Sequence, residues 1–312
     1  MKTLVTGSDG LIGSAIRNLG LKDCYFATRK DADLQNFDQT LSLFSKVKPK
    51  RVIHLAALVG GIEGNSVNPA DYFMGNIQIN VNTLEAARLN GVERLVSFMS
   101  TCVFPDQVEY PLTPSSLHSG PPHPSNFGYA YSKRMLEVQT RAYRLQWGLN
   151  YSIAIPANVY GPHDNFDLKY GHVVPSLIRK VYDSKNHNKP LEVWGTGESL
   201  REFIYSEDIA RLAIWMLDNY QDHEPLILSS GIEISIRYLV DLIVDLMNFP
   251  GQVFFDASKP DGQHRKHSDA SLLKQLNPEF NFIPISKGLS QTINWFESNY
   301  PTIRGLKHSA KS

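Results

Sequence analysis

The first residues of the chain constrain its fold more than any other stretch. Residues 2–6 form an apolar β run, the glycines Gly7, Gly10 and Gly13 follow at once, and residues 14–16 can continue a helix. A strand, a G-x-x-G-x-x-G loop and a helix in this order are typical of a dinucleotide-binding βαβ unit. Glycines let the backbone approach a pyrophosphate, and the helix N-terminus offers free N–H groups. We predict that this loop binds a cofactor through Gly7, Ser8, Asp9, Gly10, Leu11, Ile12 and Gly13.

A helical segment that begins near Ser125 or Asn126 carries the first catalytic signal. Tyr129 and Lys133 are four residues apart and therefore share a helix face. A phenol titrates near ~10, and a nearby cation favours the phenolate. We expect Lys133 to lower the pKa of Tyr129, which would make the phenol a proton donor and acceptor. The alternative is a helix surface with an exposed lysine and a half-buried tyrosine.

Another polar group follows the predicted strand at residues 94–99. Ser100 and Cys102 come directly after it, at the edge where open α/β sheets bind ligands. Ser100 can hydrogen-bond a substrate oxygen. Cys102 is either a packed core thiol, the usual place of a lone cysteine, or a reactive one. The loop at residues 103–126 is long for a connection without secondary structure, which favours a functional role.

The end of the predicted strand at residues 24–28 bears on the choice of cofactor. Arg29, Asp33 and Leu34 lie where a dinucleotide-binding unit contacts the adenosine ribose. A carboxylate there selects NAD, whereas an arginine accommodates the 2′-phosphate of NADP. Arg29 therefore favours NADP, although an arginine on the surface is also common. Small residues such as Ala56, after the strand that starts at residue 51, suit a ligand close to the backbone.

Composition excludes several classes of protein. The 312 residues carry 31 basic and 31 acidic side chains, so nothing indicates a nucleic-acid or membrane partner. No apolar run approaches 20 residues and the chain starts directly with a strand, so we expect neither a signal peptide nor a membrane span. Two cysteines make no disulfide framework, which suits the cytoplasm. His163 and His172 lack partners at metal-ligand spacing. His264 and His267 are three residues apart, but the basic residues Arg265 and Lys266 between them disfavour a cation site, and we predict no metal.

The alternation of β and α segments predicts an α/β protein with a Rossmann-type doubly wound parallel sheet. We expect this cofactor domain to span residues 1–165, with a returning segment near 201–228. Residues 166–300 are expected to form a smaller α/β substrate domain, interleaved with the first. Residues 301–312 are expected to form a tail, of which residues 307–312 are disordered. Basic residues in the second half, with Trp194 as a stacking platform, could form an anion pocket. Taken singly, each of them is a surface charge.

These motifs together resemble the extended short-chain dehydrogenase/reductases, and within that family most strongly those that make GDP-L-fucose from GDP-4-keto-6-deoxy-D-mannose. The resemblance runs to about residue 300. Besides the glycine loop, Ser100 and the Tyr129/Lys133 pair, it rests on residues 54–57, 59–61, 161–166, 172–175, 193–197 and 259–262. It implies an NADPH-dependent oxidoreductase and isomerase of GDP-fucose biosynthesis, which epimerises C3 and C5 of the sugar and then reduces the C4 ketone.

The resemblance also implies roles for single residues. Ser100, Tyr129 and Lys133 correspond to the reductase triad, in which Tyr129 protonates the C4 oxygen. Cys102 and His172 correspond to the acid/base pair of the epimerisation. The GDP moiety would be held by Lys180, Trp194, Arg201 and Lys266, and the cofactor would also be lined by Ala56, Phe98, Lys133, Pro156, Asn158, Val159 and His172. One departure weakens the case for NADP, because Asp9 stands where some members carry an arginine.

The implied chemistry suits these residue types. A C4 ketone acidifies the C3 and C5 protons, so a thiol and an imidazole suffice to exchange them. The resemblance also implies a homodimer joined through helices near residues 69–90 and 126–147. Two alternatives stay open. One is another nucleotide-sugar epimerase or dehydratase of this fold. The resemblance implies that a dehydratase would carry Asp-Glu at the positions where this chain has Cys102-Val103. A non-catalytic NADP-binding regulator is the other, although such proteins usually lose the tyrosine or the lysine.

Overall fold

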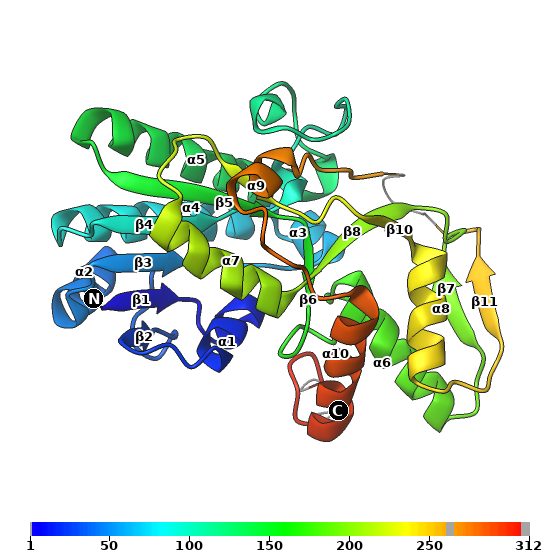
Figure 1. Ribbon diagram of the computed structural model, residues 1–312. Helices are drawn as coiled ribbons and strands as arrows, with labels where there is room; N and C mark the ends of the chain where they lie inside the picture. Colours follow the sequence, from blue (N-terminus) through cyan, green and yellow to red (C-terminus); the bar gives the residue numbers. More distant parts are fainter. Residues whose placement is uncertain (1, 260–264, 307–312) are drawn as a thin grey trace.

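A computed structural model describes residues 2–259 and 265–306. His264, most of the 259–262 motif and the tail from residue 307 lie outside the described residues. The core is a parallel sheet in the order β2-β1-β3-β4-β5-β9 (Figure 1). Its strands are β1 (Thr3–Thr6), β2 (Cys24–Phe26), β3 (Arg51–His54), β4 (Arg94–Phe98), β5 (Asn150–Pro156) and β9 (Leu226–Leu228). The strand order reverses between β1 and β3, and ligands bind at such switch points in open α/β sheets.

Helices cover both faces of this sheet because each strand is apolar on both sides. Leu4 packs into one core cluster, together with α2 (Phe37–Val47), α4 (Pro69–Leu89) and α5 (Phe127–Trp147). Its neighbour Val5 packs into another, together with α1 (Leu11–Asn18) and α7 (Ser206–Asn219). Successive side chains of a strand point to opposite faces, so this division follows from the backbone. The predicted doubly wound parallel sheet is confirmed.

A second group of elements continues from the carboxyl ends of the sheet. β6 (Asn158–Tyr160), β8 (Leu200–Tyr205) and β10 (Glu233–Ser235) form one small sheet, and β7 (Leu191–Trp194) pairs with β11 (Val253–Asp256). A third core cluster joins them to α6 (Val173–Asn186), α8 (Ile236–Leu246) and α10 (Ile285–Asn299). Of the segment expected to return to the central sheet, α7 and β9 do so. β8 instead pairs with β6 and β10.

Two of the helices are short. One is α3 (Ile62–Val67), where the Asn65 Nδ2 donates to the Gly61 carbonyl oxygen at 3.1 Å. The other is α9 (Ser271–Leu276), which precedes the 15-residue helix α10. Short connections of 3₁₀ type interrupt the 103–126 loop.

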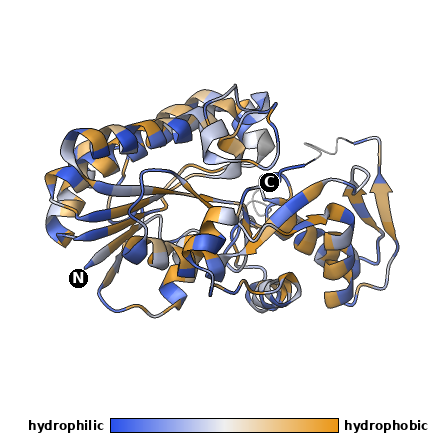
Figure 2. Ribbon diagram, turned by 45° about the horizontal axis from the view of Figure 1, so that its top comes forward, coloured by the Kyte–Doolittle hydropathy of each residue, from blue (hydrophilic) through white to orange (hydrophobic). Residues whose placement is uncertain are grey.

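The hydropathy of the helices agrees with their packing on the sheet. Along the helices, hydrophobic and hydrophilic residues alternate, as expected for helices that pack one face on a sheet (Figure 2). Within the described residues, no helix combines the length and the apolar character that a membrane crossing would need.

Candidate active site

The glycine loop lies against the end of β3. Gly7 has φ +66°, a left-handed conformation that favours glycine, and a Cβ there would lie 2.7 Å from the Ala56 Cα. A Cβ on Gly13 would lie 2.5 Å from the Ser8 Cα. Ser8 is fully buried, and its Oγ donates to the Ala27 carbonyl oxygen at 3.0 Å. The backbone at Gly7 and Gly13 is therefore packed too closely for a side chain. The N-terminus of α1 follows the loop directly, as a pyrophosphate site requires.

Asp9 has a partner that the sequence did not reveal. The guanidinium of Arg17, on α1, lies 3.7 Å from the Asp9 carboxylate and 3.2 Å from the Ser8 Oγ. It also lies over the Phe26 ring, 4.7 Å from its centroid. The negative charge that departs from the family pattern thus has a cation beside it. Helical spacing could have suggested Arg17, which follows Asp9 by eight residues, or about two helical turns.

The Asp31 carboxylate, in the turn after β2, is hydrogen-bonded by residues near it in the sequence. Asp31 accepts hydrogen bonds from the Thr28 backbone N–H at 2.8 Å and from the Tyr25 hydroxyl at 2.8 Å. These bonds hold the pKa of Asp31 below its ordinary value. Arg29 is exposed in the same turn, and Asp33 and Leu34 follow it. Asp31 is therefore hydrogen-bonded within the turn, where Arg29 and Lys30 are both exposed.

Tyr129 and Lys133 share a buried face of α5. The Lys133 Nζ donates to the Phe98 carbonyl oxygen at 2.9 Å and lies 6.0 Å from the centroid of the Tyr129 ring. The expectation that Lys133 lowers the pKa of Tyr129 is wrong for this geometry. Burial raises the pKa of Tyr129, and Cys102 adds to the rise, while a hydrogen bond with Ser100 opposes it. Burial also lowers the pKa of Lys133 to about 8. Tyr129 is a neutral phenol, which is the state that a proton donor needs.

Ser100 and Cys102 meet in the turn after β4. The Ser100 Oγ lies 2.7 Å from the Cys102 Sγ, and Ser100 also hydrogen-bonds Tyr129. Cys102 is a free, partly buried thiol. It also lines a small pocket together with Lys266. The structure thus brings the hydroxyl, the thiol and the phenol into one hydrogen-bonded group.

His172 lies immediately before α6. Its Nδ1 is 3.6 Å from the Oδ1 of Asp164, a carboxylate that is 3% exposed. The contact with Asp164 raises the pKa of His172, whose side chain is 54% exposed. The other oxygen, Asp164 Oδ2, is buried without a hydrogen-bond partner among the described residues. Asp164 is a functional candidate that sequence reasoning missed, although it lies inside the 161–166 motif.

The proposed nucleotide-binding residues fall into two places. Trp194 is 60% exposed at the end of β7, and the ammonium of Lys180 lies 5.3 Å from its ring centroid. Lys259 lies 6.0 Å from the same ring. Arg201 on β8 and Lys266 are electrostatically coupled, and burial lowers the pKa of Lys266. An aromatic surface flanked by cations suits a base, and a pair of cations suits a diphosphate.

The remaining cofactor candidates lie where strands of the central sheet end. Ala56 follows β3, Phe98 ends β4 and Pro156 ends β5. Asn158 and Val159 start β6, and the Asn158 Nδ2 donates to the Glu202 carbonyl oxygen at 2.8 Å. His54 is buried, and its ring nitrogens lie 2.8 Å from the Thr6 Oγ1 and 3.2 Å from the Asn80 Oδ1. His54 is therefore a packed residue of the sheet.

Comparisons with known proteins agree with this geometry. The chain belongs to the NAD dependent epimerase/dehydratase family, which residues 3–228 match. It is 44% identical over 310 residues to a GDP-L-fucose synthase of Dictyostelium discoideum, covering 96% of this chain and 97% of that protein. It is 33% identical over 318 residues to a GDP-L-fucose synthase of Escherichia coli, covering 97% and 99%. The crystal structure of a GDP-L-fucose synthetase from Naegleria fowleri bound to NADP superimposes with a TM-score of 0.93 at 40% identity, covering 97% and 94%.

Proposed function

We propose that this protein is an NADPH-dependent enzyme that converts GDP-4-keto-6-deoxy-D-mannose to GDP-L-fucose. The observation that carries the proposal is the group formed by Ser100, Cys102 and Tyr129. A ketone reductase needs the serine and the tyrosine, whereas the thiol 2.7 Å from the serine hydroxyl is an additional acid/base group. The GDP-L-fucose synthases that match nearly the whole chain support the same substrate.

In the reduction, Tyr129 gives its proton to the C4 oxygen of the sugar. Burial keeps the phenol protonated, and Ser100 stabilises the developing negative charge on the same oxygen. Lys133 is fixed by the Phe98 carbonyl oxygen, with its ammonium 6.0 Å from the centroid of the Tyr129 ring. NADPH, when bound, supplies the hydride to C4.

In the epimerisation, one of Cys102 and His172 removes a proton from carbon and the other returns one to the opposite face. Each removal leaves an enediolate whose charge rests on the C4 oxygen, which Ser100 and Tyr129 already face. Asp164 orients the His172 ring and favours its protonated form. The same oxygen contacts thus serve both reactions, which explains why one pocket suffices.

The residues present fit NADPH. The close packing of Gly7 on Ala56 leaves space only for backbone beneath a pyrophosphate. Asp31 is hydrogen-bonded within its own turn. We therefore assign the binding of the 2′-phosphate to Arg29. Arg17 offsets the charge of Asp9. We assign residues 1–165, with α7 and β9, to the cofactor, and residues 166–300 to the sugar nucleotide, in which Trp194 stacks on the base while Arg201 and Lys266 contact the diphosphate.

We further propose a homodimer through α4 and α5. These helices pack on each other and expose large apolar side chains, namely Met74, Val81, Leu89, Tyr131, Met135, Val138, Leu145 and Trp147. Covering such residues with a second copy would remove them from water. Sedimentation at micromolar concentration should give the mass of a dimer, and a monomer would remove this assignment. We place the enzyme in the cytoplasm, where reducing conditions would keep Cys102 a thiol.

The deciding experiment is incubation with GDP-4-keto-6-deoxy-D-mannose and NADPH, followed by NMR of the sugar. GDP-L-fucose as the product supports the proposal. Reduction at C4 without inversion at C3 and C5 would show that the protein is a ketone reductase without epimerase activity. Removal of a hydroxyl group from the sugar would indicate a different nucleotide-sugar enzyme. No change of the sugar, with NADPH bound, would favour a regulator.

A further inference from the structure

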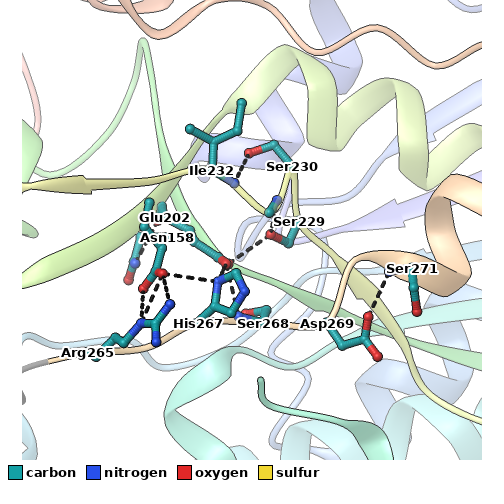
Figure 3. Close-up of polar contacts among 12 residues, drawn as sticks. Asn158, Glu202, Ser229, Ser230, Ile232, Arg265, His267, Ser268, Asp269 and Ser271 are labelled. Carbon is teal, nitrogen blue, oxygen red and sulfur yellow. Dashed lines mark hydrogen bonds and ion pairs between the residues drawn. The ribbon is translucent and has the colours of Figure 1, made fainter. Parts of the chain in front are cut away.

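A buried carboxylate in the substrate half has no place in the mechanism above. Glu202, on β8, is fully buried, and a buried charge is costly unless it is paired and hydrogen-bonded. Its Oε2 accepts from the Ser229 Oγ at 2.8 Å, and its Oε1 accepts from the Ser268 backbone N–H at 2.9 Å and contacts the His267 Nδ1 at 3.1 Å (Figure 3). Two of these three contacts come from one segment, residues 265–269.

A second carboxylate binds the same segment. Glu233, on β10, lies directly opposite Glu202 in the antiparallel pair, an arrangement in which like charges repel. Arg265 contacts both oxygens of Glu233 from its Nε, at 2.9 and 3.0 Å, and the His267 Nδ1 lies 3.3 Å from the Glu233 Oε2. Arg265 holds the pKa of Glu233 below its ordinary value. We call Glu202, Glu233, Arg265 and His267 the carboxylate clamp.

The backbone of the segment is fixed from the other side. The Tyr110 hydroxyl donates to the Arg265 carbonyl oxygen at 2.6 Å. The Leu112 N–H donates to the His267 carbonyl oxygen at 2.7 Å, and the Asp269 N–H donates to the Leu112 carbonyl oxygen at 2.9 Å. Residues 265–269 are therefore held between the loop after β4 and the strands β8 and β10.

Lys266 lies between the two basic residues of the clamp. In an extended segment successive side chains point to opposite sides, so Lys266 faces away from Arg265 and His267. It lines the small pocket that also contains Cys102 and Asn126. A lysine has a long, flexible side chain, and a segment already fixed in place loses less freedom when it binds a ligand.

We propose that the carboxylate clamp is a positioning device that holds Lys266 at the diphosphate of the nucleotide sugar, with His267 as its central residue. This inference rests on the proposed function, because it takes Lys266 to contact GDP. Glu202 also bonds Ser229, which directly follows β9 of the central sheet. The clamp therefore joins the segment that carries Lys266 both to the small sheet and to the sheet that carries the cofactor.

The test compares His267→Leu with His267→Asn. The Asn Nδ2 can replace the His Nδ1 as a donor to Glu202, whereas leucine cannot donate. His267→Leu should raise the Kd for GDP and the KM for the sugar nucleotide about tenfold, as expected when a side chain must be ordered on binding. The kcat and the Kd for NADPH should stay near those of the wild type, and His267→Asn should restore GDP affinity. Arg265→Met, at the more exposed end of the clamp, should act in the same direction.

Lys266→Met tests whether Lys266 binds GDP, separately from whether the carboxylate clamp positions it. If Lys266→Met leaves GDP binding unchanged, the assignment of Lys266 is wrong and the clamp positions nothing. If Lys266→Met weakens GDP but His267→Leu does not, the positioning role alone is wrong. The double variant should bind GDP no more weakly than Lys266→Met, because the clamp acts through the lysine. A fall in melting temperature and in kcat with KM and the GDP Kd unchanged would show that the clamp only supports the fold.

Discussion

The reduction and the epimerisation can be separated by two substitutions in one hydrogen-bonded group. Tyr129→Phe removes the phenolic proton and the bond to Ser100, but keeps a ring that is 8% exposed and therefore keeps the packing of α5. A general acid contributes about 10²–10⁴ in rate. The C4 reduction should therefore slow by about 10²–10⁴, which corresponds to about 3–5 kcal/mol in the barrier. Cys102 and His172 stay in place, so deuterium from D₂O should still enter C3 or C5.

Cys102→Ser should do the reverse. The serine can still hydrogen-bond Ser100, 2.7 Å from the present sulfur, but an alcohol gives up its proton far less readily than a thiol. Exchange at carbon should fall by about 10²–10⁴ while ketone reduction continues. The product would then be GDP-6-deoxy sugars other than GDP-L-fucose.

The assay is mass spectrometry and NMR of the sugar after incubation of each variant in D₂O, with NADPH oxidation followed by absorbance. Binding of NADPH to both variants provides the control for folding. If Cys102→Ser exchanges both carbon-bound protons at the wild-type rate, Cys102 is only a packed thiol. Wild-type reduction by Tyr129→Phe would refute the role of Tyr129 as the acid.

Three further predictions concern charge. Arg29→Ala should weaken NADPH binding more than NADH binding, by about 1.5–3 kcal/mol for a charge-assisted phosphate contact, and equal losses in titrations with the two cofactors would place Arg29 in solvent. Asp164→Asn should lower the pKa of His172, because the carboxylate is the main cause of its rise, so the limb of the exchange–pH profile that reports His172 should move to lower pH. Burial lowers the pKa of His54 from 6.5 to about 3, so below pH 6.5 the unfolded chain binds a proton that the folded chain excludes. The free energy of unfolding should therefore fall by up to about 5 kcal/mol as the pH drops from 6.5 toward 3. Denaturant titrations should show a weaker dependence in His54→Asn, and an unchanged one would contradict this account.

Sequence periodicity predicted the central sheet because its signals are local. The apolar run before Gly7, the glycine spacing and the Tyr129/Lys133 spacing each depend on residues within a few positions of one another. Because each signal follows a predicted parallel strand, their order along the chain predicts that they meet at the carboxyl-end edge of the sheet. The strand ends that carry Ser100 and Pro156 could be placed on that edge for the same reason.

What the sequence did not predict depends on contacts between distant residues. The partnership of Glu202 with His267 joins residues 65 positions apart, and that of Glu202 with Ser229 joins residues 27 apart. The pKa of Tyr129 is another case, because burial is the main cause of its rise and no local pattern gives the depth of burial. Asp164 lay in a recognised motif, but only its distance to His172 indicates a role.

The late arrival of β9 has a consequence for synthesis on the ribosome. β5 pairs with β9 at Ala154, Ile155 and Pro156, yet β9 is made about 70 residues after β5, once β6, β7 and β8 have emerged. At about 5–20 residues per second, the edge of an apolar parallel strand stays open for roughly 4–14 s. An open strand edge is a template for aggregation. Nascent chains should therefore engage holding chaperones in this interval, and a fragment that ends before residue 226 should aggregate even though it contains the whole glycine loop.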